Sequence, residues 1–146
     1  MKLTFWLSLL SVASAISYCP PRPATTAEQT TIFYELVTKF YLKKNIRAAF
    51  EDHFSPQWTE HSPLAPPGTL NDTITALSGL AAISNFTIIH AGFYNNTGYV
   101  HLRQDTQGSA PEAIADIFGY NGTCVVEHWD ITQAKPNNSV NPLAMW

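Results

Sequence analysis

An acidic residue in the middle of an apolar, strand-like run is the position in this sequence best suited to chemistry. Asp116 lies in the run AIADIFGY, residues 113–120, where Ile114 and Phe118 share its side of an extended strand. Burying an ionised carboxylate without a partner costs several kcal/mol, so an apolar site would favour the neutral acid. A carboxyl group balanced between its two forms can act as a general acid or base. Asp116 either does this in a pocket or faces solvent on a half-exposed strand.

The partner of Asp116 depends on the turn that follows its strand. A two-residue turn at Asn121-Gly122 would pair Asp116 with Glu127, whereas a three-residue loop would pair it with His128. His101 alternates with Val100 and Leu102, so it either faces outward or lines a pocket. The residues that we expect to line the pocket are Trp58, His61, His90, Tyr94, Tyr99, Phe118, His128 and Trp129.

Other kinds of active site lack their sequence patterns. The chain has no Gly-x-Ser-x-Gly motif for a serine nucleophile and no glycine-rich phosphate loop. Its five histidines do not show the spacing of a metal site with a third ligand, so we expect no bound metal.

The first 15 residues, MKLTFWLSLLSVASA, resemble a secretory signal peptide. A lysine precedes an apolar run, and Ala13-Ser14-Ala15 fits the small-residue cleavage pattern. The run is shorter than the roughly 20 residues that span a bilayer. We therefore expect cleavage after Ala15, a secreted, extracellular protein and no membrane attachment after cleavage.

Two further features agree with secretion. Five Asn-x-Ser/Thr sites predict a glycoprotein, with acceptors at Asn71, Asn85, Asn95, Asn121 and Asn137. The two cysteines, Cys19 and Cys124, can form one disulfide in an oxidising compartment or remain free thiols.

The charge balance argues against nucleic acid as a partner. The chain has 8 basic and 11 acidic residues, a formal charge of −3. Removing Lys2 with the signal leaves 7 against 11, so the mature charge is −4. A negative net charge gives no electrostatic attraction for nucleic acid or for an anionic membrane.

The hydrophobic period changes near residue 85, which predicts an α+β domain. Residues 16–26 contain three prolines and should form an extended arm. Apolar periodicity predicts helices over 26–45, 45–54 and 69–84, separated by a proline-rich loop or irregular strand. Residues 85–105 and 110–133 read as two hairpins, and the apolar end of the tail, 135–146, should dock on the body. Helices packed in a curved sheet leave a cavity suited to a small hydrophobic molecule.

Residues Asp116-Ile117-Phe118 and Val126–Asp130 (VEHWD) resemble the SnoaL-like polyketide cyclases of the nuclear transport factor 2-like superfamily. The order of elements agrees over residues 27–146, which would form the SnoaL-like domain. The resemblance implies a cone-shaped α+β barrel, with N-terminal helices packed in a strongly curved antiparallel sheet, and often a homodimer. It also implies aldol-type cyclisation or isomerisation of a small hydrophobic carbonyl compound without a cofactor. Asp116 would then be the catalytic acid/base and His101 would assist it.

The sequence departs from the family pattern beside Asp116. Gly119 stands where the family usually has Arg, which would remove a cation close to the acid, and the Asn121-Gly122 turn comes one residue early. Two functions therefore remain: a secreted acid/base cyclase or isomerase, and a non-catalytic secreted protein whose pocket binds an apolar small molecule.

Overall fold

The described residues form three α-helices, a π-helical turn and a five-stranded sheet. The computed structural model describes residues 17–65 and 68–146, so the predicted signal peptide lies outside the described residues. In chain order the elements are α1 (Thr26–Val37), η1 (Thr38–Leu42), α2 (Ile46–His53), β1 (Phe54–Glu60), α3 (Leu70–Ile83), β2 (Ser84–Tyr94), β3 (Thr97–Thr106), β4 (Glu112–Asn121) and β5 (Cys124–Ala134). Within these ranges no helix has both the length and the apolar character needed to span a membrane.

Side-chain caps fix where the helices begin. The Thr25 hydroxyl accepts from the backbone N–H of Glu28, whose carboxylate accepts from the backbone N–H of Thr25 in return. Thr69 and Asp72 form the same reciprocal pair at the start of α3. Such capping boxes satisfy backbone donors that the helix leaves free. The three predicted helices are confirmed, with the first continuing into η1.

The sheet has the order β1-β5-β4-β3-β2 and is open, with β1 and β2 at its edges. Neighbouring strands from β2 to β5 are antiparallel, as predicted, but β1 pairs in parallel with β5. The sheet is therefore mixed rather than wholly antiparallel. The α+β class predicted from the sequence is confirmed.

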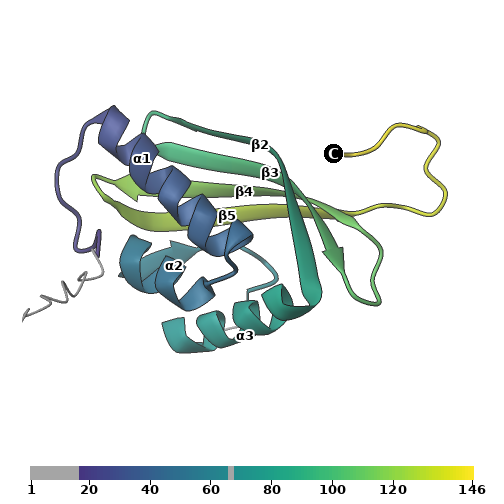
Figure 1. Cartoon of the computed structure of the whole chain (residues 1–146), viewed down its shortest axis with the longest axis horizontal. Helices are drawn as coiled ribbons and strands as arrows, with labels where there is room; N and C mark the ends of the chain where they lie inside the picture. The colour runs from purple at the N-terminus through teal and green to yellow at the C-terminus, as the bar shows by residue number, and fades with distance from the viewer. Residues whose placement is uncertain (1–16, 66–67) are drawn as a thin grey trace, which may run out of the picture.

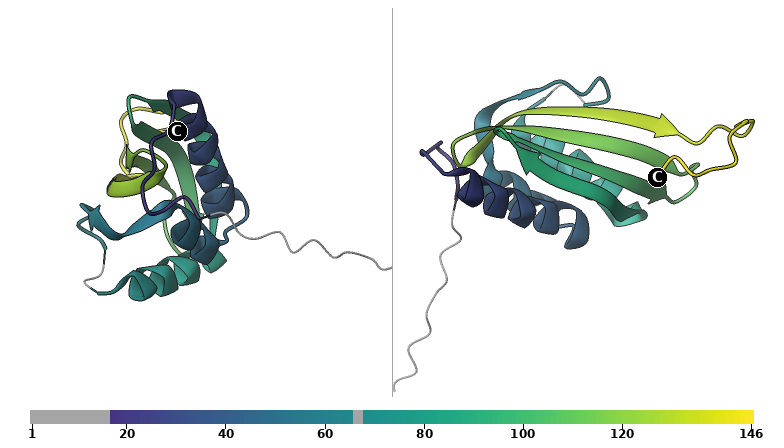
Figure 2. Two further views of the ribbon diagram at one scale, coloured as in Figure 1. Left: turned by 90° about the vertical axis from the view of Figure 1, so that its left-hand side faces the viewer. Right: turned by 90° about the horizontal axis from the view of Figure 1, so that it is seen from above.

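All three helices lie on one face of the curved sheet (Figures 1 and 2). The face that the helices cover is called here the inner face. Phe33 and Leu36 of α1 are fully buried against Leu102 and Phe118 on this face. The edge of the Phe33 ring lies where a side chain on Gly98 would stand, 2.4 Å from the position of an added Cβ. The opposite face of the sheet, called here the outer face, has no helix against it among the described residues.

Two irregularities in the strands decide which side chains reach the inner face. The register of β2 against β3 shifts between Ile88 and His90, and that of β4 against β5 shifts at Val126. Each inserts one extra residue and reverses the alternation beyond it. The turns are Asn95-Asn96 and Gly122-Thr123, and the second lies one residue after the expected Asn121-Gly122 turn.

The N-terminal arm is fastened to the second hairpin. The predicted disulfide between Cys19 and Cys124 is present. The backbone N–H of Thr123 donates to the Arg22 carbonyl, and the Thr123 hydroxyl donates to the Tyr18 carbonyl. Gly122 has φ +53°, and an added Cβ would lie 1.9 Å from the Arg22 carbonyl oxygen. The turn therefore requires glycine both for its backbone conformation and for the close approach of the arm.

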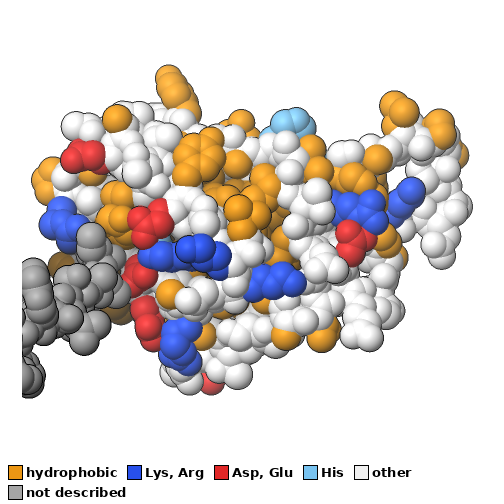
Figure 3. Space-filling model, viewed as in Figure 1, with side chains coloured by type: hydrophobic (Ala, Val, Ile, Leu, Met, Phe, Trp, Pro, Cys, Tyr) orange, Lys and Arg blue, Asp and Glu red, His pale blue; other side chains and the backbone are white. Residues whose placement is uncertain are grey.

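The predicted docking of the tail is limited to its two ends: the backbone N–H of Lys135 donates to the Pro111 carbonyl, and Trp146 contacts Arg103. The Arg103 guanidinium lies 4.4 Å from the centre of the Trp146 ring. Val140 and Leu143 are exposed instead of buried. Elsewhere on the surface, acidic and basic side chains lie side by side over α1 and α2 (Figure 3).

Candidate active site

A cavity of about 350 Å³ lies between α3 and the inner face of the sheet. One wall is apolar and comes from Leu77, Leu80 and Ala81 of α3, with Phe40, Phe86 and Leu102. A polar wall belongs to β4 and β5. The polar side chains there are Glu112, Asp116, His128, Asp130 and Thr132. The cavity is large enough for a small organic molecule.

Asp116 lies in this polar wall and has two side-chain partners. The Tyr41 hydroxyl donates a hydrogen bond to its Oδ2 atom. The Nε2 atom of His128 is 3.5 Å from its Oδ1 atom. The Asp116 side chain is only 13 % exposed, so both contacts act where water screens them little. In addition to the expected apolar neighbours, Asp116 therefore has a hydrogen-bond donor and an imidazole beside it.

The π-helical turn η1 supplies Tyr41. Its wider winding places the fully buried Tyr41 above β4, with the ring against Phe86 at 5.7 Å between centroids. Burial is the largest cause that raises the pKa of Tyr41, and the neighbouring Asp116 raises it further. The phenol therefore stays protonated and acts as a donor. Single π-turns of this kind occur often at functional sites.

His128 lies between two carboxylates. Its Nδ1 atom is 3.0 Å from Oε1 of Glu60 on β1, and its Nε2 atom faces Asp116. Burial alone would lower the pKa of His128, but the hydrogen bonds and charges of Asp116 and Glu60 outweigh it and raise the pKa to about 9. His128 is therefore an imidazolium at neutral pH: its Nδ1–H group donates to Glu60, and its Nε2 atom forms an ion pair with Asp116.

The register differs from both alternatives considered from the sequence. Asp116 is directly opposite Asp130 on β5, because the turn is shifted and Val126 is the extra residue of the bulge. Asp116 therefore meets His128 on the diagonal rather than as a direct pair. His128 nevertheless shares a face of the sheet with Asp116, as it would after a three-residue loop. Glu127 points to the outer face.

The structure places five of the expected pocket residues on the outer face. His90 and His101 stack there, with Nδ1 atoms 3.2 Å apart, and His61 stacks on Trp129 at 4.7 Å between centroids. Tyr94 and Tyr99 are exposed beside them. His101 is opposite Ala115, whereas Asp116 is opposite the buried Val100. The expectation that His101 assists Asp116 is therefore wrong in this geometry, because the two side chains project from opposite faces of the sheet.

The other three expected residues lie on the inner face. His128 lines the cavity. Phe118 is buried at 1 % exposure, with its ring 5.0 Å from that of His128, and Trp58 packs 6.1 Å from the same ring. These two aromatic side chains are packing around His128 rather than cavity wall.

Gly119 also lies on the outer face. A Cβ added there would contact Glu127 and Trp129 at 3.3 Å. An arginine at this position would project away from Asp116, because positions three apart on a regular strand point to opposite faces. The absence of the family's arginine therefore removes no cation from the cavity.

Three site residues were not identified from the sequence. Tyr41 lies on the apolar stripe of a helix, Glu60 lies in a proline-rich segment, and Asp130 ends the VEHWD motif. The only signal for Tyr41 is general: a buried tyrosine hydroxyl needs an acceptor. Its acceptor is 75 residues away in sequence, which no local pattern reveals.

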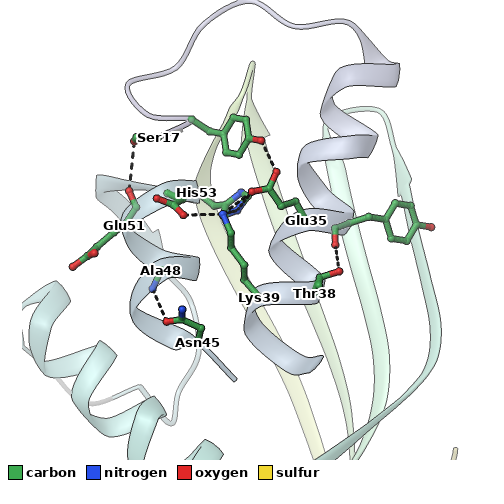
Figure 4. Close-up of polar contacts among 11 residues, drawn as sticks. Ser17, Glu35, Thr38, Lys39, Asn45, Ala48, Glu51 and His53 are labelled. Carbon is green, nitrogen blue, oxygen red and sulfur yellow. Dashed lines mark hydrogen bonds and ion pairs between the residues drawn. The ribbon is translucent and has the colours of Figure 1, made fainter. Parts of the chain in front are cut away.

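A second polar cluster lies outside the cavity, between α1, α2 and the arm (Figure 4). The Lys39 ammonium donates to Glu35 at 2.6 Å and to Asp52 at 2.7 Å, and Tyr18 donates to Glu35. His53 is completely buried beside them. Burial, followed by the positive charge of Lys39, lowers the pKa of His53 to about 4. These contacts join the arm to the helices and do not reach Asp116.

Comparison with known proteins identifies the fold. No protein-family model matches the sequence, and no curated protein is similar to it. Among solved structures, AclR from Streptomyces galilaeus, provisionally assigned as a hydroxylase, is similar with a TM-score of 0.59 and 14% identity, over 75% of this chain and 91% of that one. A provisionally assigned polyketide cyclase from Acidithiobacillus ferrooxidans gives 0.57 and 16%, over 75% and 90%. A nuclear transport factor 2-like protein of unknown function from Burkholderia xenovorans gives 0.60 and 11%, over 75% and 89%. The chain therefore has the nuclear transport factor 2-like fold, as its resemblance to the SnoaL-like proteins predicts.

Proposed function

We propose that the protein is a cofactor-free acid/base enzyme, a cyclase or isomerase that acts on a small, mostly apolar carbonyl compound. The observation that carries this proposal is the position of Asp116, in the polar wall of an otherwise apolar cavity, with Tyr41 and His128 beside it. Solved structures with the same fold include a provisionally assigned polyketide cyclase, which supports the same class of reaction.

In the proposed reaction, the Asp116 carboxylate removes a proton from the carbon next to the substrate carbonyl. The electron pair of that C–H bond becomes an enolate, whose oxygen then needs a donor. Tyr41 and the imidazolium of His128, which contact the Asp116 carboxylate in the resting protein, are the donors for this oxygen once Asp116 has taken the proton. In an isomerase, Asp116 returns the proton to another carbon. In a cyclase, the enolate carbon attacks a second carbonyl of the same molecule, and the new alkoxide takes the proton.

Proton exchange tests this proposal without knowledge of the natural substrate. The probe is 2-tetralone in deuterated buffer, and NMR follows the loss of its α-protons in excess of the buffer rate. General acid–base catalysis contributes about 10²–10⁴ in rate, so Asp116→Asn should lower the exchange rate at least a hundredfold. The matched control is Glu127→Gln, a carboxylate of β5 on the outer face, which should leave exchange unchanged. Unaltered exchange in a folded Asp116→Asn protein would contradict the proposal.

The same experiment separates the enzyme from a non-catalytic binding protein. One observation favours the latter: Tyr41, Asp116, His128 and Glu60 already satisfy one another, as a purely structural network would. If 2-tetralone binds but its exchange matches that of the buffer in the wild-type protein, the pocket binds without chemistry.

We also propose that the protein is secreted and glycosylated. The disulfide between Cys19 and Cys124 suits an oxidising compartment. The five acceptor asparagines, Asn71, Asn85, Asn95, Asn121 and Asn137, are all exposed. Expression through a eukaryotic secretory pathway should give a mature protein that begins at residue 16 and loses mass on treatment with an amidase that removes N-linked glycans. An unprocessed N-terminus would contradict this.

A further inference from the structure

The charged side chains around the cavity are almost all acidic. Four carboxylates line it, those of Glu60, Glu112, Asp116 and Asp130, and the only cationic side chain among the described lining residues is that of His128. With His128 protonated, the formal charge of the wall is −3, counted as four negative charges and one positive. Lysine and arginine are absent from the lining residues that the structure describes.

The imidazolium does not balance all of this charge. Its two ring N–H groups are directed at Glu60 and Asp116. Asp130 and Glu112 have no cation within ion-pair distance among the described residues, although both line the cavity. Asp130 is also the direct cross-strand partner of Asp116, so two carboxylates lie next to each other on one face. A ligand that brings a positive charge would relieve this repulsion.

The apolar wall determines the rest of the ligand. The side chains of Leu77 and Leu80 on α3 line the cavity together with the carboxylates of β4 and β5. A molecule that fits both walls has an apolar body on the α3 side and a positive group on the side of β4 and β5. An anionic ligand would meet uncompensated carboxylates in a partly dehydrated space.

We propose that the occupant of this cavity is an apolar molecule that carries a protonated amine, with Asp130 and Glu112 as the residues that select its charge. The inference rests on the proposed function and narrows its substrate to an amine-bearing carbonyl compound. The site selects against carboxylates of the same shape.

Three probes with one ring system test the inference at pH 7. They are 2-naphthylmethylamine, which is cationic, 2-naphthylmethanol, which is neutral, and 2-naphthoic acid, which is anionic. Titration calorimetry on the full mature protein measures the three dissociation constants. We expect the amine to bind at least tenfold more tightly than the alcohol, and the acid at least tenfold more weakly.

Two variants test whether Asp130 and Glu112 cause the preference for the amine. Asp130→Asn and Glu112→Gln should each reduce the preference for amine over alcohol at least threefold, while the affinity for the alcohol stays within twofold. The matched control Glu127→Gln removes a carboxylate on the outer face and should leave all three affinities unchanged. Equal effects of Glu127→Gln and Asp130→Asn would attribute the preference to overall charge and overturn the assignment.

The outcomes distinguish this inference from the proposed function. If the alcohol binds and the amine has no advantage, the charge preference is wrong, while the apolar cavity and Asp116-dependent proton exchange can stand. If the amine binds preferentially but proton exchange does not depend on Asp116, the selectivity stands and the proposed enzyme does not. If none of the probes binds, the charge preference is overturned, and proton exchange on 2-tetralone decides the proposed function separately.

Discussion

The pKa of His128 predicts how stability falls on the alkaline side of neutrality. Its pKa rises from an ordinary 6.5 to about 9 in the folded protein. A histidine whose pKa is raised by folding stabilises the protein fully below 6.5, and this contribution is lost as the pH rises through 9. At 1.36 kcal/mol for each pH unit, the full difference is about 3 kcal/mol of unfolding free energy.

Urea unfolding with the disulfide intact measures this directly. We expect the unfolding free energy to fall by up to about 3 kcal/mol between pH 6.5 and pH 9, with the slope of the urea dependence unchanged. His128→Gln should be less stable at pH 6.5 and nearly flat over that range. His90→Gln on the outer face is the matched control and should keep the wild-type profile. A wild-type protein that is equally stable at both pH values would refute a charged His128 between Glu60 and Asp116.

Further predictions follow from other contacts. The pKa of His53 is lowered to about 4, so its stabilising contribution is present above 6.5 and disappears as the pH falls toward 4; His53→Gln should flatten part of the acid limb in the same urea experiment. Gly122→Ala should cost more than about 2 kcal/mol, because the added Cβ meets the Arg22 carbonyl, and thermal unfolding measures the loss. Gly79→Ala is the matched control, since its Cβ meets nothing within 4 Å, and should raise stability by about 0.5–1 kcal/mol through helix propensity. Replacing both Cys19 and Cys124 with Ser should lower the unfolding free energy by about 2–5 kcal/mol in urea, and equal stability would show that the disulfide adds nothing.

Local patterns in the sequence were enough to predict the helices and the two hairpins. The apolar stripe of 26–45 and the capping threonines are short-range features, and so are the turn residues of the two hairpins. The parallel pairing of β1 with β5 is not, because it joins segments about 70 residues apart, as in Glu60 with His128. The proline-rich sequence around Pro56 also lacks a clear strand pattern, so β1 could not be recognised.

The candidate site was only partly predictable for a related reason. Asp116 could be identified because an acidic residue is unusual in the middle of an apolar run. Which partner it faces depends on the bulge at Val126, and an inserted residue of this kind leaves no clear pattern. His101 shows the opposite error: the resemblance assigned it a role, whereas its alternation with Val100 and Leu102 left either face open, and the register places it on the outer face.

The covalent link between residues 19 and 124 encloses most of the chain in a single ring, since the two cysteines are 105 positions apart. One protease cut at any bond between them would leave both fragments attached to each other. A nicked protein would therefore migrate as one species on a non-reducing gel and as two after reduction, so damage to a loop could pass unnoticed unless the sample is reduced first.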